Sequence, residues 1–119
     1  MNVLIVDDNE SAADLLRELV TLQDHTARCA YTAQQAIDAA AAERFDAALI
    51  DLTLPDRPGT EVARHLRNGE GGAAMLLIAI SGYAAGEAGS DTPGLFDHHL
   101  QKPIDLDTLD RLMAPPGDT

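Results

Sequence analysis

The sequence is short of cysteine and of basic residues, and each shortage excludes a class of protein. A single cysteine, Cys29, cannot form a disulfide within the chain, and its place in an apolar segment predicts a small buried hydrophobic residue. Lys and Arg together number 8 against 20 Asp and Glu, which gives a formal net charge of −12. Because binding to nucleic acids and to anionic membranes depends on cations that neutralise phosphates, we expect the chain to bind neither directly.

Long apolar runs are also missing. No run approaches the roughly 20 residues that a transmembrane helix needs. The opening apolar stretch has no basic residues before it and is followed by two acids, which is not the pattern of a secretory signal, so we expect a cytoplasmic location. A chain of 119 residues that is 45% hydrophobic and 24% charged fits one compact globular domain. We expect this domain to span residues 1–114, with 115–119 as a frayed tail.

Strand-like and helix-like segments alternate along the chain. Short apolar runs predict strands at residues 3–6, 47–50 and 75–80, and the pattern adds a weak strand around 26–30 and a last strand near 98–101. Helices are predicted after Asn9, from about 33 to 43, from about 61 to 68, and from about 105 to 113. Thr32 and Gln35 have the spacing of a capping box, and Thr60 is the predicted cap of the third helix.

This alternation predicts an α/β fold with a parallel sheet covered by helices on both faces, because parallel neighbours need right-handed crossover connections. Five units fit a doubly wound sheet of flavodoxin-like strand order 2-1-3-4-5. We expect a shortened, irregular or mobile fourth helix between residues 83 and 95. Three glycines and Pro93 disfavour a helix there, and between Ala85 and Pro93 no large apolar side chain is available to dock it on the sheet.

Polar side chains follow the strands at the points where they end. Asp7 and Asp8 follow the first strand, Asp51 the third and Ser81 the fourth, while Lys102 follows the fifth. In an open parallel sheet these carboxyl ends share one edge, so the five residues should share one pocket. Clustered carboxylates repel one another unless a cation neutralises them, and Mg²⁺ prefers such oxygens. The sequence therefore predicts a magnesium site beside a hydroxyl and an ammonium that suit a phosphoryl group.

Each of these residues also has an ordinary structural interpretation. Asp8 or Asn9 is a suitable helix cap, Ser81 is a common turn residue, and a lone Lys102 before proline is usually a solvated charge. The joint pattern, rather than any single residue, favours the functional interpretation.

Four segments, in order, resemble the receiver domains of response regulators and hybrid histidine kinases, and the resemblance runs over nearly the whole chain. These segments are Asp7-Asp8-Asn9-Glu10, the loop from Asp51 to Pro55 with Gly59, Ser81-Gly82-Tyr83, and the segment ending in Lys102-Pro103. The resemblance implies a two-component signalling switch rather than an enzyme. Weak self-phosphorylation from small donors and self-dephosphorylation are implied as well.

The resemblance also implies a role for each matched residue. Asp51 would accept a phosphoryl group from a histidine kinase or a histidine phosphotransfer protein. Asp7 and Asp8 would hold Mg²⁺ together with Asp51 and the backbone carbonyl of Thr53. Ser81 would hydrogen-bond the phosphoryl group, and Lys102 would pair with it, because in-line phosphoryl transfer needs positioning and charge neutralisation.

Three further positions are matched more loosely. Thr53 and Tyr83 lie where the family modulates hydrolysis of the phosphoryl group. His99 stands where the family usually has Tyr or Phe as a mobile aromatic switch. A histidine there could still rotate and adds a group that titrates near neutral pH, but an ordinary edge-strand histidine is the simpler interpretation.

Three alternatives share the fold or the nucleophile. A receiver used only as a phosphorylation-independent docking module would be expected to lack an acid or the lysine, and all are present. A phosphatase of the haloacid-dehalogenase type usually has a second acid two residues after the nucleophile, where this chain has Thr53. A flavodoxin-type cofactor binder would need a phosphate-binding loop after the first strand, where the acids stand instead.

Overall fold

The computed structural model describes residues 2–52, 54, 56–69, 75–81, 96–101 and 106–112. The segment expected to form a shortened fourth helix, residues 83–95, lies outside the described residues, as does the expected tail at 115–119.

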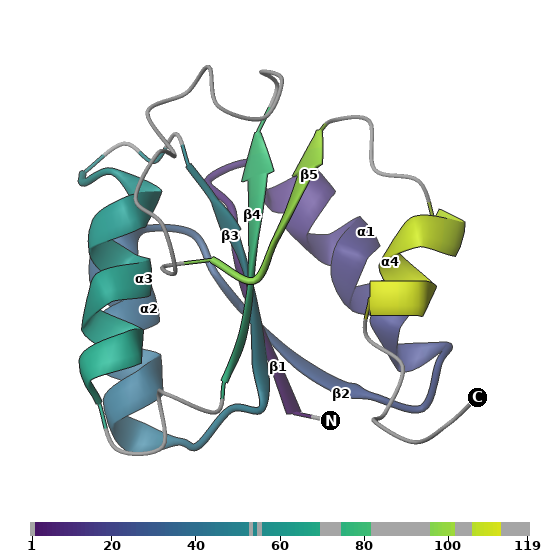
Figure 1. Cartoon of the computed structure of the whole chain (residues 1–119), viewed down its shortest axis with the longest axis horizontal. Coiled ribbons are helices and arrows are strands. Elements are labelled where there is room, and N and C mark those ends of the chain that lie inside the picture. Colours follow the sequence, from purple (N-terminus) through teal and green to yellow (C-terminus); the bar gives the residue numbers. More distant parts are fainter. Residues whose placement is uncertain are drawn as a thin grey trace.

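Five parallel strands form one sheet. They are β1 (Asn2–Val6), β2 (Thr26–Ala30), β3 (Ala47–Asp51), β4 (Leu76–Ser81) and β5 (His98–Gln101). Their spatial order is β2-β1-β3-β4-β5, and every neighbouring pair is parallel (Figure 1). The predicted flavodoxin-like order is therefore confirmed.

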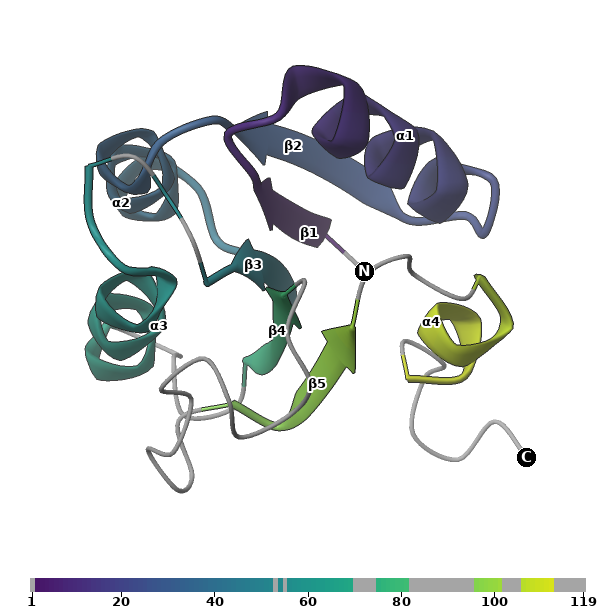
Figure 2. The same cartoon turned by 90° about the horizontal axis from the view of Figure 1, so that it is seen from above.

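Helices cover both faces of this sheet. They are α1 (Glu10–Thr21), α2 (Ala33–Ala42), α3 (Gly59–Asn68) and α4 (Leu106–Leu112). Figure 2 shows α1 and α4 on one face and α2 and α3 on the other, which is the doubly wound arrangement. Among the described residues, no helix combines the length and the apolar character needed to cross a bilayer.

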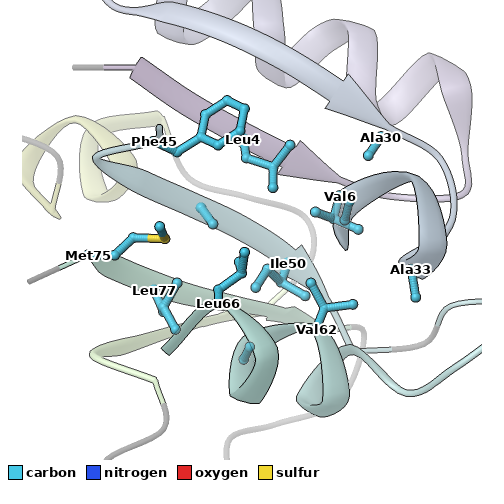
Figure 3. Close-up of a cluster of buried hydrophobic side chains, with 13 residues drawn as sticks. Leu4, Val6, Ala30, Ala33, Phe45, Ile50, Val62, Leu66, Met75 and Leu77 are labelled. Carbon is cyan, nitrogen blue, oxygen red and sulfur yellow. The ribbon is translucent and has the colours of Figure 1, made fainter. Parts of the chain in front are cut away.

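The core has two layers, because alternate residues of each strand point to opposite faces. On one face, Val62 and Leu66 of α3 lie beside Ile50 and Leu77 of the sheet (Figure 3). On the other face, Leu16 and Val20 of α1 and Leu109 of α4 pack on the sheet; the strand residues of this layer include Val3, Ile5, Leu49, Ile78, Ile80 and Leu100. All five residues of β3 are buried, as expected of a central strand covered on both sides.

The helix starts were predicted with mixed success. Thr32 caps α2 as expected, since its Oγ1 accepts a hydrogen bond from Gln35 N at 3.1 Å. Gln35 Oε1 in turn accepts from Tyr31 N at 2.9 Å, one residue before the position that a capping box uses. The prediction of Thr60 as a cap is wrong, because α3 begins at Gly59 behind Pro58, with no side-chain cap hydrogen bond.

Cys29 is half-buried rather than fully buried, because β2 is an edge strand of the sheet. Its Sγ lies 3.5 Å from the carbonyl oxygen of Ala13 in α1. Burial raises the pKa of the thiol, which keeps it protonated and agrees with an unreactive role.

The end of α3 is joined to the sheet by Arg67. Its Nη1 donates to the carbonyl of Met75 at 2.6 Å, and its Nη2 donates to Asp97 Oδ2 at 3.0 Å. The same Asp97 oxygen accepts from Leu77 N at 2.8 Å. Arg67 and Asp97 therefore connect α3 with the segments where β4 and β5 begin, at the edge of the sheet opposite the carboxyl ends.

Candidate functional site

Three carboxylates meet where β1 and β3 end. One oxygen from each of Asp7, Asp8 and Asp51 lies within 4.8 Å of the others. Val6 and Ile50 are register partners in adjacent strands, so Asp7 and Asp51 are the next residues along each strand. The carboxyl ends of these parallel strands thus bring together three acids that are up to 44 positions apart in the sequence.

The cluster is unusually buried for acidic residues. Asp7 is 2% exposed and Asp51 is 5% exposed, while Asp8 lies at the surface. Two buried carboxylates at this separation raise the free energy of their charged forms unless a cation or hydrogen-bond donors compensate. A hard divalent cation is the partner that such an oxygen-rich set accepts most readily.

Helix capping does not account for Asp8. The N-cap of α1 is Asn9, whose side-chain oxygen accepts from Ala12 N at 3.2 Å. Asp7 Oδ1 accepts from Asn9 N at 3.0 Å, which fixes one edge of the Asp7 carboxylate. The ordinary interpretation of Asp8 as a helix cap is therefore wrong, and its carboxylate faces the cluster instead.

The backbone around Asp51 is held from two sides. Leu52 N donates to the carbonyl of Ile80 at 3.0 Å, and Gly59 N donates to the carbonyl of Leu52 at 3.1 Å. Gly59 lies so close that an added Cβ would overlap the carbonyl oxygen of Asp51 and lie 2.8 Å from Leu52 Cα. Only a residue without a side chain fits there, so the glycine allows the start of α3 to press against the Asp51 backbone.

The fourth strand ends beside the cluster. Asp51 pairs with Ile80 across the sheet, and Ser81 is the next residue and the last of β4. The backbone thus places Ser81 at the same edge of the sheet; the structure describes its backbone only. Thr53, Tyr83 and Lys102 also lie outside the described residues.

His99 lies on β5 in register with Ala79. It is half-buried, and its Nε2 is buried with no hydrogen-bond partner among the residues that the structure describes. Among the described residues, no hydrogen bond or ion pair joins His99 to the carboxylate cluster, so its assignment as a switch residue stays a prediction.

Sequence reasoning missed one side chain in the loop that follows Asp51, namely Asp56. Its Oδ1 accepts from Ala33 N at 2.9 Å and its Oδ2 accepts from Gln34 N at 3.0 Å. The hydrogen bond from Ala33 is the main cause that lowers the pKa of the Asp56 carboxyl. An acid in a proline-rich loop is normally predicted to be a turn residue. No local pattern indicates that its side chain accepts a hydrogen bond from a helix residue 22 positions earlier in the chain.

The fold and the cluster together define a flavodoxin-like α/β protein with an acidic site at the carboxyl edge of its sheet. Residues 3–114 match the family model of the response regulator receiver domain, and the chain belongs to that family. It is thus a receiver domain of the two-component signalling type, and this family is a signalling family rather than a classical enzyme family.

Curated relatives support the same family. The chain is 31% identical over 110 residues to a protein named response regulator MprA from Mycobacterium avium, and 30% identical to the protein of the same name from Mycobacterium tuberculosis. Each alignment covers 92% of this chain and 47% of the relative. The chain therefore spans about half the length of the curated relatives it matches.

Solved structures have the same fold. A CheY-like receiver domain from Methylobacillus flagellatus matches with a TM-score of 0.82 and 31% identity, covering 94% of both chains. The receiver domain of the sensor histidine kinase PA1611 from Pseudomonas aeruginosa matches with a TM-score of 0.80 and 24% identity, covering 93% of this chain and 92% of that one. That second structure is described as having a magnesium ion coordinated in its active site cleft.

Proposed function

We propose that this chain is a phosphorylation switch in which Asp51 accepts a phosphoryl group from a histidine kinase or a histidine phosphotransfer protein. The observation that supports the proposal best is the convergence of Asp7, Asp8 and Asp51 within 4.8 Å at the carboxyl edge of a receiver fold. A docking module that never becomes phosphorylated would have no need for this buried acidic cluster.

The donor set of the cluster suits Mg²⁺. Asp7, Asp8 and Asp51 would each supply a carboxylate oxygen, and the backbone carbonyl of Thr53 would add a fourth ligand. When bound, the ion would neutralise charge on the phosphoryl oxygens and on the carboxylates around them. The magnesium seen in the PA1611 receiver agrees with this assignment.

Asp51 would act as the nucleophile. One carboxylate oxygen attacks the phosphorus of a phosphohistidine, so that a phosphorus–oxygen bond forms while the phosphorus–nitrogen bond breaks. The imidazole leaves with the electron pair of that bond and takes a proton from water. The product is an acyl phosphate on Asp51, whose phosphoryl group carries about 1.5 to 2 negative charges at neutral pH in place of the single negative charge of the carboxylate.

Other residues would hold the transferred group and pass on the signal. Ser81, at the end of β4, would donate its hydroxyl to a phosphoryl oxygen, and Lys102 would pair with another. Thr53 and Tyr83 would modulate hydrolysis of the acyl phosphate. His99 would occupy the position of the aromatic switch, where rotation of its ring would report the state of Ser81.

The activity of the longer relatives belongs to this chain only as a proposal, because it spans about half of their length. We expect the output to depend on protein contacts, since a net charge of −12 opposes binding of this segment itself to nucleic acid.

Labelling by a small phosphodonor tests the proposal. With acetyl phosphate and Mg²⁺, intact mass spectrometry should show one labile adduct of about 80 Da, the mass of a phosphoryl group. Asp51→Asn should remove the adduct because an amide oxygen is a poor nucleophile and forms no acyl phosphate.

Asp46→Asn is the matched control, because Asp46 lies just before β3, at the opposite end of that strand. This variant should be labelled like the wild type. Absence of labelling in the wild type, or full labelling of Asp51→Asn, would refute the proposal.

A further inference from the structure

The loop between Leu52 and Gly59 directly follows Asp51, and the described residues at its tip are exposed to solvent. Asp56, Arg57 and Pro58 are all exposed, and only Leu54 packs against the core from the described part of the loop. Packing therefore does not fix the tip. Its position depends on polar contacts.

Those contacts run to the first turn of α2. Asp56 accepts two backbone hydrogen bonds, from Ala33 N at 2.9 Å and from Gln34 N at 3.0 Å. Arg57 Nη2 donates to the side-chain oxygen of Gln34 at 3.3 Å. The two carboxylate oxygens thus satisfy two of the amide groups that a helix start leaves unpaired, and negative charge at that end is favourable.

The base of the loop is joined to the phosphoacceptor. Gly59 N donates to Leu52 O at 3.1 Å, and Gly59 presses against the carbonyl of Asp51. Because the loop is short and tied at its base, a shift of its tip is transmitted to Leu52 and Asp51. Asp56 therefore restrains the tip of the loop, and Gly59 restrains its base.

We infer that Asp56 is a positioning residue for Asp51, which it holds in place by fastening the loop after the phosphoacceptor to the start of α2. The inference rests on the proposed function, in which Asp51 is the nucleophile. Asp56 touches neither the carboxylate cluster nor the reacting atoms, and it acts through the backbone of the loop. The same connection makes the first turn of α2 sensitive to the state of the phosphoacceptor loop.

Thr32 provides a matched control, because it caps the same helix and no hydrogen bond joins its side chain to the described residues of the loop. Its Oγ1 accepts from Gln35 N at 3.1 Å. Asp56→Ala and Thr32→Ala each remove acceptors from the first turn of α2, and both should lower the stability of the domain. Only Asp56→Ala releases the loop.

Two measurements separate positioning from capping. In amide hydrogen exchange, Asp56→Ala should increase exchange at Gly59 and Leu52 relative to Thr32→Ala, because Gly59 N closes the base of the loop on Leu52 O and Leu52 N holds the start of the loop on Ile80 O of β4. In labelling by acetyl phosphate with Mg²⁺, Asp56→Ala should be about 3- to 10-fold slower than wild type, since small misplacements of reacting groups are costly. Thr32→Ala should label at the wild-type rate.

The conservative variant grades the effect. Asp56→Asn keeps one acceptor oxygen of two, so its labelling rate should lie between those of the wild type and Asp56→Ala. Equal exchange at Gly59 and Leu52 in Asp56→Ala and Thr32→Ala would overturn the inference and leave Asp56 as a helix cap only. Failure of the wild type to label would instead refute the phosphoacceptor role, and the exchange comparison would still decide the role of Asp56.

Discussion

Gly59→Ala should disturb the phosphoacceptor more than any other single methyl addition at a described glycine. The new Cβ would overlap the carbonyl oxygen of Asp51 and lie 2.8 Å from Leu52 Cα and 3.0 Å from the carbonyl carbon of Asp51. All three are backbone atoms, so no side chain can rotate away to make room. The start of α3 and the end of β3 must move apart.

The size of the effect follows from these distances. Ordinary van der Waals contact begins at 3.4 Å, so Leu52 Cα must retreat by roughly 0.6 Å, and the Asp51 carbonyl by more. Overpacking of this kind lowers the free energy of unfolding by about 1–3 kcal/mol. Without the clash, alanine at a helix start would stabilise the domain by up to ~1 kcal/mol, so the sign of the change is informative. A displacement near the nucleophile should also slow labelling by about tenfold or more.

Gly69→Ala is the matched control, because the nearest atoms to its new Cβ are 3.5 and 3.7 Å away. Urea unfolding should place this variant within about 0.5 kcal/mol of the wild type, with an unchanged labelling rate. The reasoning would be refuted if Gly59→Ala were as stable as Gly69→Ala and accepted the phosphoryl group at the wild-type rate.

Three further predictions concern charge. Asp8→Asn should weaken Mg²⁺ binding by at least about tenfold in a calorimetric titration. Glu10 lies outside the cluster, so Glu10→Gln should leave the Mg²⁺ affinity unchanged. Equal affinities in the two variants would place the metal elsewhere. Arg67→Ala should lower the free energy of unfolding by about 2 kcal/mol, because it removes the hydrogen bonds to Met75 and Asp97. Arg17→Ala should change it by no more than about 0.5 kcal/mol, because the 3.9 Å ion pair of Arg17 is exposed. Equal losses in the two variants would contradict this prediction. Burial raises the pKa of Asp97, but the hydrogen bonds from the Leu77 amide and the Arg67 guanidinium outweigh it and hold the pKa below its usual 3.8. The stability from this carboxylate is therefore present above pH 3.8 and is lost as the pH falls below it. In urea unfolding, the free energy of unfolding should decrease less between about pH 5 and about pH 2.5 for Asp97→Asn than for the wild type. Parallel curves of stability against pH would refute the assignment.

Much of the fold could be predicted from the sequence because its signals are local. Three apolar runs bounded by polar residues, with helical segments between them, indicate parallel strands with crossovers, and the structure has them. Errors arose where a tertiary contact decided the outcome. Thr60 has the chemistry of a cap, yet α3 begins at Gly59, two residues earlier than predicted, where Gly59 packs against the backbone of Asp51. Cys29 is half-buried because β2 lies at the sheet edge, which composition does not reveal.

The site residues, too, were predicted where a local pattern marks them and missed where a tertiary contact decides. Asp7, Asp8 and Asp51 were predicted to converge because strand ends share an edge, and they do. Asp56 was missed because its partners, Ala33 and Gln34, are distant in the sequence and are backbone groups without any side-chain signature. Contacts of that kind become visible only when the two loops are seen together.

Identifying the residue that carries the phosphoryl group tests most directly the claim that Asp51 is the phosphoacceptor. Borohydride reduces an acyl phosphate to the alcohol, so an aspartyl phosphate becomes homoserine, which tandem mass spectrometry assigns to a position. After incubation with acetyl phosphate and Mg²⁺, homoserine should be found at position 51 and at none of the other acids, and chelation of the metal should abolish it. Homoserine at position 7 or 8, or its absence from position 51 in labelled protein, would contradict the assignment of Asp51 as the phosphoacceptor.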